Sequence, residues 1–209
     1  MSRKSFSVLP WGGSPIVALL IGWAIGFGLP MPSQAHPLPD LPVRSYFLED
    51  GSVEIRVEVD PRCFEKDPEA EGFLMKAMID NLTADEQAEM KTQAEKFVGE
   101  RLRFLFDPKG ELKPQFDWEF RKLGDSSPLL YVADEVVLVG VWKLKQREGI
   151  SAYRIEALEL TPEKMGIPLN VNFLNFVGGK QVERFAVLFP GETSFAFDVG
   201  SLKETNAAN

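Results

Sequence analysis

The stretch Val53-Glu-Ile-Arg-Val-Glu-Val59 decides the fold class. Its four aliphatic residues alternate with three charged ones, so the apolar side chains share one face of an extended chain and the charged side chains share the other. This period of two is typical of an antiparallel strand that buries one face and exposes the other to water. The stretch therefore predicts a β protein, with Val53 to Val59 in its core.

Similar patterns lie on both sides of this strand. Asp50-Gly51, a favoured hairpin pair, precedes it, and Tyr46 and Leu48 indicate a partner strand before the turn. Further strands are predicted at 102–106, 116–121, 129–144, 153–160, 169–177, 182–189 and 194–199, separated by turn residues. Short strands at near-regular spacing are the signature of an antiparallel β-sandwich, which is the fold we predict.

Residues 67–100 have a different character, because Ala, Glu, Lys, Met and Gln dominate and β-branched residues are few. Helical spacing begins near Pro68, and Thr83 with Glu86 forms a capping box at the start of a second helix. We therefore predict a two-helix insertion at 67–100. It is interpreted as cover over a sheet edge or sandwich end, with a binding role as the alternative.

The chain begins with features of a cleavable secretory signal peptide. Arg3 and Lys4 precede an apolar run from Ile16 to Leu29, whose fourteen residues would span about 21 Å as a helix, short of the roughly 30 Å bilayer core. Small residues at Ser33 and Ala35 suit signal peptidase, so we expect cleavage between Ala35 and His36. The alternative is an uncleaved signal anchor.

This interpretation divides the chain into a signal peptide at 1–35, a β-sandwich domain at 36–203 and a flexible tail at 204–209. The expected location is the periplasm or the cell exterior. No later segment has the length and apolarity of a membrane span, so we expect no transmembrane segment in the mature protein.

The charge balance excludes two classes of partner. Cleavage would remove two of the 23 basic residues and none of the 31 acidic ones, leaving a formal net charge of −10. Nucleic acids and anionic membranes both favour a basic surface, so neither is an expected partner.

Several catalytic and metal-binding motifs are absent. The chain has one histidine, one cysteine, no phosphate-binding GxxxxGK[ST] loop and no HExxH or CxxC motif. Cys63 cannot form an internal disulfide, so it is either a buried, inert thiol or a link between two chains. We predict no catalytic residue and no bound organic cofactor.

His36 is the one candidate metal ligand. After cleavage at Ala35, its imidazole and its free α-amine would form a pair of nitrogen donors suited to copper or zinc. Pro37 lacks an amide N–H, so the next backbone nitrogen cannot join them. The alternative is that His36 merely follows the cleavage site.

Two other groups of residues are candidates for binding sites. Acidic residues near turns could hold Ca²⁺ or form a carboxylate pair for glycoside hydrolysis, but they read better as solvated turn and strand positions: Asp50, Asp107, Glu111, Asp117 and Glu119. Trp118 and Trp142 could stack on a sugar if exposed, but their alternating apolar runs favour a place in the core.

Two stretches resemble a known family. The first stretch is Ala35-His-Pro-Leu-Pro39, which is followed by a predicted strand and by Asp50-Gly51. The second stretch is the predicted helix-to-strand run from Glu95 to Gly110. Both resemble the extracytoplasmic domain of the hydrogenase/urease accessory (HupE/UreJ-like) proteins. The resemblance implies an exported β-sandwich in a context of metal handling. The membrane-spanning half typical of that family has no counterpart here, so no transport role is carried over.

Three function hypotheses follow. The leading one is a non-enzymatic interaction or accessory module, acting as the soluble partner of a membrane protein complex. The second is copper or zinc binding through His36. The third is a carbohydrate-binding module or a hydrolase, whose site would use the acidic loops and the two tryptophans.

Overall fold

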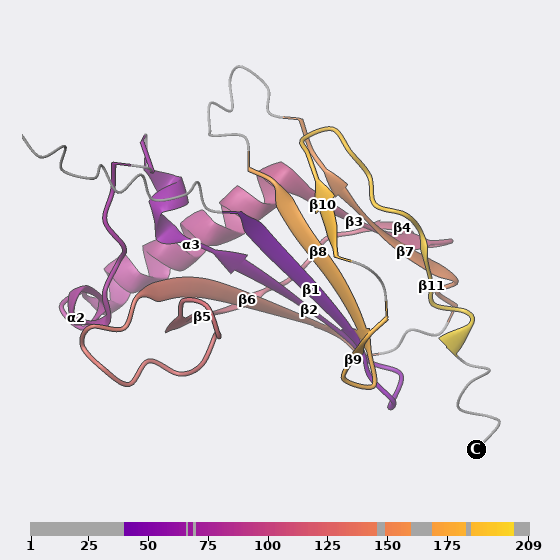
Figure 1. The fold of residues 1–209 in the computed structure, drawn as a ribbon, viewed down its shortest axis with the longest axis horizontal. Coiled ribbons are helices and arrows are strands. Elements are labelled where there is room, and N and C mark those ends of the chain that lie inside the picture. The colour runs from indigo at the N-terminus through magenta and orange to yellow at the C-terminus, as the bar shows by residue number, and fades with distance from the viewer. Residues whose placement is uncertain are drawn as a thin grey trace, which may run out of the picture. The chain divides into compact units, whose positions relative to one another are not determined.

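Two β-sheets and one long helix form the fold (Figure 1). The computed structural model describes residues 40–65, 67–68, 70–145, 149–159, 169–182 and 185–202. Strands predominate among these residues, so the prediction of a mainly β protein is confirmed.

The larger sheet has seven strands in the order β10-β8-β1-β2-β6-β5, and β9 pairs with β8 outside this path. The strands are β1 (Leu41–Phe47), β2 (Val53–Val59), β5 (Asp117–Lys122), β6 (Val136–Leu144), β8 (Val171–Val177), β9 (Lys180–Gln181) and β10 (Ala186–Leu188). All pairings are antiparallel except that of β1 with β8, which is parallel. The expectation of a wholly antiparallel sandwich is corrected at this pair. Most of the chain separates β1 from β8, so no short hairpin dictates their direction.

The smaller sheet has four antiparallel strands in the order β11-β7-β3-β4. They are β3 (Leu102–Asp107), β4 (Gly110–Leu112), β7 (Ala152–Ala157) and β11 (Phe197–Asp198). Aromatic rings pack across the space between the sheets. The ring centroids of Phe47 and Tyr153 are 5.9 Å apart, and those of Phe104 and Trp142 are 5.7 Å apart. The two sheets therefore share one core, as a sandwich does.

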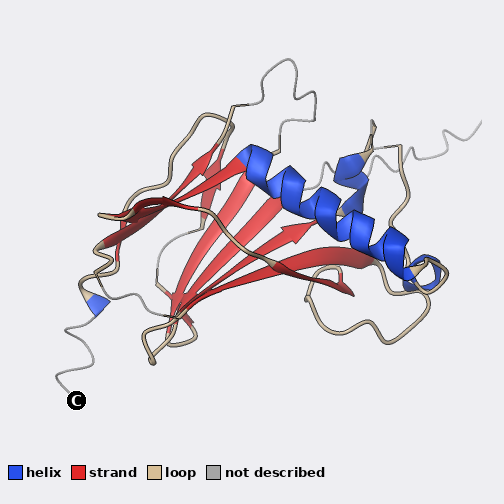
Figure 2. Ribbon diagram, turned by 180° about the vertical axis from the view of Figure 1, so that it is seen from behind, coloured by secondary structure: helices blue, strands red, loops and turns tan. Residues whose placement is uncertain are grey.

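The helices are the 3-10 turn η1 (Pro61–Phe64), α2 (Lys76–Ile79) and α3 (Ala84–Arg101). Figure 2 shows α3 lying across the strands of the larger sheet. Ala94, Phe97 and Val98 of α3 belong to the shared core, and the Trp118 indole N–H on β5 donates to Glu95 at 2.6 Å. The inner face of the larger sheet is thus covered by the smaller sheet and by α3.

The start of α3 confirms the predicted capping box. The Thr83 hydroxyl accepts from the Glu86 backbone N–H, and the Glu86 carboxylate accepts from the Thr83 backbone N–H at 2.8 Å. The other helix was predicted to begin near Pro68, but α2 begins at Lys76 and has one turn. The reason is that the preceding residues pair with another segment: Val136 N–H donates to Leu74 O, and Met75 bridges to Glu135.

Some predictions fall on residues outside the described part of the chain. These are the signal peptide at 1–35, its cleavage before His36, and the tail at 204–209. None of the helices within the described ranges combines the length and apolar composition that a membrane span requires.

Candidate functional site

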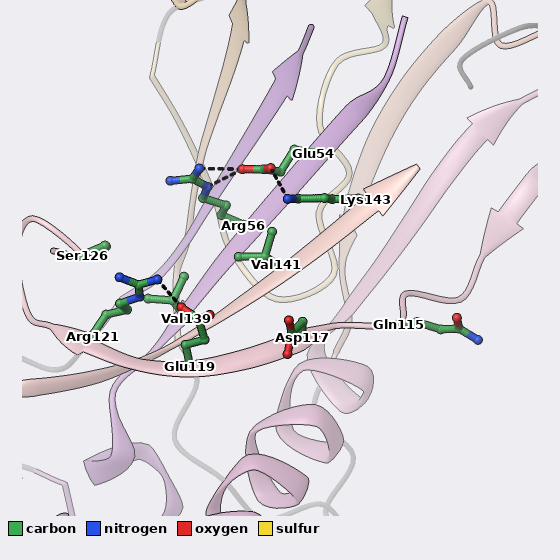
Figure 3. Close-up of a pocket in the computed structure, with 10 residues that line it drawn as sticks. All are labelled: Glu54, Arg56, Gln115, Asp117, Glu119, Arg121, Ser126, Val139, Val141 and Lys143. Atoms are coloured by element: carbon green, nitrogen blue, oxygen red, sulfur yellow. Dashed lines mark hydrogen bonds and ion pairs between the residues drawn. The ribbon is translucent and has the colours of Figure 1, made fainter. Parts of the chain in front are cut away.

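The outer face of the larger sheet carries a groove over β2, β6 and β5 (Figure 3). Alternation along these strands sends apolar side chains inward to the core and leaves charged ones outside. The groove has a volume of about 510 Å³. It is lined by Glu54, Arg56, Gln115, Asp117, Glu119, Arg121, Ser126, Val139, Val141 and Lys143.

The strand register explains the layout of the groove. β6 is central, and its Val141 lies between Arg56 of β2 and Asp117 of β5. Two residues before Val141, on the same face of β6, Val139 is the register partner of Glu119 on β5. Because each valine has a charged residue beside it, the groove has an apolar floor and a charged rim.

Ion pairs order one side of the rim. Glu54 accepts from Arg56 Nε at 2.7 Å, and its other carboxylate oxygen lies 3.5 Å from Lys143 Nζ. The Glu54 side chain is itself mostly buried, at 13% exposed. One carboxylate between two cations gives this side of the rim a net positive charge at its outer surface.

The opposite side has the other sign. Arg121 pairs with Glu119 along β5, and Asp117 adds a carboxylate that is not part of an ion pair in the described structure. Figure 3 shows Asp117 on the β5 side, across the valine floor from Arg56 and Lys143. The groove therefore presents positive charge along β2 and β6 and negative charge along β5.

The lining combines charged and apolar groups. It offers charge-assisted hydrogen bonds at the rim and apolar contact at the floor, and it contains neither histidine nor cysteine. Among the described residues, no group of three or more His, Cys, Asp and Glu side chains is placed to hold a metal ion.

The acidic residues singled out in the sequence do not form one site. Asp117 and Glu119 line the groove, whereas Asp50 stabilises its own turn by accepting from Ser52. On the smaller sheet, Asp107 pairs with Arg154 at 2.8 Å, and Glu111 lies 3.7 Å from Arg103. Of these five residues, only Asp117 and Glu119 therefore share one surface.

Of the ten residues that line the groove, only Asp117 and Glu119 were considered as site residues from the sequence. Glu54, Arg56 and Lys143 were read as a wet strand face or not singled out. The charged alternation was visible, but only the pairing of β2, β6 and β5 shows that the three strands share one charged surface.

Trp118 and Trp142 are both buried in the core, as the sequence favoured. Trp118 lies over Gly140, and Trp142 makes edge contacts with Phe104 and Phe106. A buried ring cannot stack on a sugar in solution, so the tryptophan platform of the carbohydrate hypothesis is not present.

Cys63 is a free thiol on η1 that is half-buried. Burial, reinforced by the nearby Asp60 carboxylate, raises its pKa to about 12. The thiol is therefore protonated at neutral pH, which agrees with an inert role. His36 lies outside the described residues, so copper or zinc binding there stays a prediction.

Comparison with known proteins gives no relative that assigns a function. No protein-family model and no curated protein matches the chain. The resemblance to the hydrogenase/urease accessory domain therefore stays a prediction from the sequence.

Proposed function

We propose that this chain is a non-enzymatic accessory protein of the periplasm or cell exterior, and that it acts by binding a partner protein in the groove on the outer face of the larger sheet. The observation that carries the proposal is the groove itself: a valine floor, with positive charge on one side and negative charge on the other.

The groove chemistry selects a kind of partner. A small ion would meet charges that are already paired within the rim, so it would gain little. A protein segment with one apolar side chain and flanking charges of both signs would satisfy floor and rim together. The carboxylate of Asp117, which belongs to none of these ion pairs, would face the basic end of such a segment.

The predicted signal peptide supports the periplasmic or extracellular location in this proposal. Residues 1–35 carry the basic start, apolar run and small-residue ending of a signal peptide. The resemblance to an extracytoplasmic accessory domain fits the same compartment. Sequencing the N-terminus of the protein recovered from its own cells tests this part, and we expect His36 as the first residue.

Site-specific photo-crosslinking in intact cells tests the groove. A photoreactive amino acid replaces Lys143 at the rim, and in a control it replaces Glu111 on the smaller sheet, whose side chain is also well exposed. We expect one discrete adduct from position 143 and none from position 111.

A charge reversal makes this test specific for the rim. In the protein that carries the photoreactive residue at position 143, Glu54→Arg removes the carboxylate that pairs with Arg56 and puts a second cation beside it, so we expect the adduct to be lost while the protein stays folded. An adduct that is equally strong from position 111, or unchanged by Glu54→Arg, would show that the groove is not the binding surface.

A further inference from the structure

The two edge strands of the larger sheet expose different kinds of side chain. β5, at one edge, has Asp117, Glu119 and Arg121 on the face that forms the groove. Charged side chains on an edge strand discourage a further strand from pairing with it. β10, at the other edge, pairs only with β8 among the described strands (Figure 1). Residues 185–189, which contain β10 and which we call the β10 edge, include no charged side chain, so this edge lacks the protection that β5 has.

The β10 edge exposes three large apolar side chains. Phe185, Val187 and Phe189 are 53%, 39% and 54% exposed, whereas Leu188 belongs to the core. A spacing of two residues places the three exposed side chains on one face of the extended chain. Single exposed apolar residues are common on proteins, but three on one face of an unprotected edge form a patch that favours association.

The backbone of the β10 edge requires an extended occupant. Within a sheet, successive residues of a strand direct their N–H and C=O groups to opposite neighbours. The groups of β10 that point away from β8 have no paired strand within the described ranges. An extended chain placed there hydrogen-bonds to these groups and sets every second side chain beside the exposed apolar ones. The occupant must therefore be a strand with apolar residues at alternate positions.

The sequence of the β10 edge is complementary to itself. Phe-Ala-Val-Leu-Phe has Phe, Val and Phe at alternate positions from either end, with Val187 at its centre. If two copies pair antiparallel about Val187, Phe185 of each copy lies opposite Phe189 of the other, and the two Val187 side chains lie opposite each other. Cross-strand aromatic and aliphatic pairs of this kind stabilise antiparallel sheets. A second copy of this strand thus meets the requirements of both the backbone and the side chains.

We propose that the β10 edge is a dimer interface, at which the β10 strands of two copies of this chain pair antiparallel about Val187. A two-fold axis through the Val187 pair uses both unpaired edges at once, so the assembly closes at a dimer. The larger sheets of the two copies become one continuous sheet. The groove lies over β2, β6 and β5, towards the other edge of each sheet, and stays open. This proposal does not depend on the proposed function of the groove.

Substituted cysteines test the pairing and its register. In Val187→Cys the two thiols lie opposite each other, where the Cα atoms of paired residues are about 4.5–5.5 Å apart, within the range of a disulfide. In the matched variant Phe185→Cys, on the same face of the same strand, the two thiols are offset by roughly 14 Å along the strands. We expect oxidised glutathione to link Val187→Cys into a covalent dimer but not Phe185→Cys. The unaltered protein controls for Cys63, which is half-buried.

A mixture of two variants tests the register at a second position. Phe185→Cys and Phe189→Cys should each fail to form a covalent dimer alone, because neither thiol faces its own copy across the axis. Mixed together, they should form a disulfide between position 185 of one copy and position 189 of the other, identified by peptide mapping. Equal linkage in all the cysteine variants would indicate random collision, and a missing link at position 187 would exclude pairing about that residue.

Sedimentation velocity over a range of concentrations tests the dimer without a cross-link. The full sequence is expressed with its own first 35 residues, and the protein is studied as the cell processes it. We expect a dimer at micromolar concentration, and we expect Val187→Lys, which puts a charge at the centre of each edge, to weaken it by at least about tenfold. The control is Leu130→Lys, at an apolar side chain that is 72% exposed on the loop before β6, and it should leave the dimer unchanged. Monomers at every concentration, assemblies that grow beyond a dimer, or equal loss with Leu130→Lys would each overturn the proposal.

Discussion

Gly140 on β6 is a position where the larger sheet has no room for a side chain. A Cβ atom there would lie 2.8 to 2.9 Å from three atoms of the Trp118 ring on the paired strand. Gly140→Ala must therefore displace a buried indole that also donates to Glu95. We expect a loss of about 1–3 kcal/mol in the free energy of unfolding, measured by urea denaturation followed by tryptophan fluorescence.

Gly99 provides the matched control for this substitution. It lies inside α3, and a Cβ atom there would meet nothing within 4 Å. Gly99→Ala should stabilise the protein by about 0.5–1 kcal/mol, because alanine restricts the unfolded chain and favours the helix. Equal effects of the two substitutions would refute the tight contact between Gly140 and Trp118.

The Cys63 thiol should be unreactive in the folded protein. With its pKa raised to about 12 by burial and by Asp60, only a minute fraction is thiolate at pH 8. We expect alkylation by iodoacetamide to be at least about a hundredfold slower in the folded protein than in urea. Rates that agree in the two states would contradict the burial of this thiol.

The same pKa has a consequence for stability. The unfolded chain releases the Cys63 proton near the ordinary pKa of 9.0, whereas the folded chain retains it to about pH 12. Between these values the folded state binds more protons, so its stability falls as the pH rises. Cys63→Ala should remove this part of the alkaline decline in the free energy of unfolding.

At the scale of elements, the capping box at Thr83 governs the start of α3. Thr83→Ala removes the hydroxyl that accepts from Glu86 N–H, and we expect a loss of about 1 kcal/mol in the free energy of unfolding. Thr92→Ala is the control, because the Thr92 hydroxyl only donates to Ala88 O within the same helix. That substitution should leave the stability nearly unchanged.

The capping box also predicts an effect of pH. Hydrogen bonds from Thr83 lower the pKa of Glu86 below its ordinary value of 4.5. A lowered pKa means that the ionised carboxylate stabilises the fold above pH 4.5, and that this contribution is lost as the pH falls further. Glu86→Gln should therefore flatten the acid side of the stability profile. An unchanged acid limb would argue against this carboxylate bond.

Elements set by local sequence were predictable, whereas those set by distant contacts were not. β2 follows from its own alternation, and α3 follows from its capping box. The apolar run from Leu129 to Leu144 predicts one long strand, but β6 begins at Val136. Asp134 folds the preceding residues into a turn by accepting from Leu130 and Tyr131, a contact that the apolar composition of the run conceals.

The same distinction applies to the candidate site. The charged faces of β2 and β5 were recognisable one strand at a time. Their assembly around β6, and the parallel pairing of β1 with β8, depend on where the chain returns after passing through the other sheet. A sequence pattern with a period of two predicts which face of a strand is exposed to water, but it does not predict which strands are neighbours.

For the whole molecule, the contact between the two sheets includes a buried hydrogen bond that joins them. Ser45 on β1 donates its hydroxyl proton to the Tyr153 hydroxyl on β7 at 3.0 Å, and both residues are fully buried. Removing either partner leaves the other hydroxyl buried without that bond. We expect Ser45→Ala and Tyr153→Phe each to lower the free energy of unfolding by about 1–3 kcal/mol.

The double variant decides whether this bond or the packing around it matters. Tyr153→Phe keeps the ring that packs edge-on against Phe47 of β1 and Phe173 of β8, so apolar contact between the sheets is preserved. If the bond is the shared cause of both losses, Ser45→Ala combined with Tyr153→Phe should lose less than the sum of the single variants, since neither hydroxyl is then left unpaired. Urea denaturation of all four proteins gives the coupling energy. Simple additivity would mean that the two hydroxyls stabilise the sandwich independently, and that the bond between them does not couple its sheets.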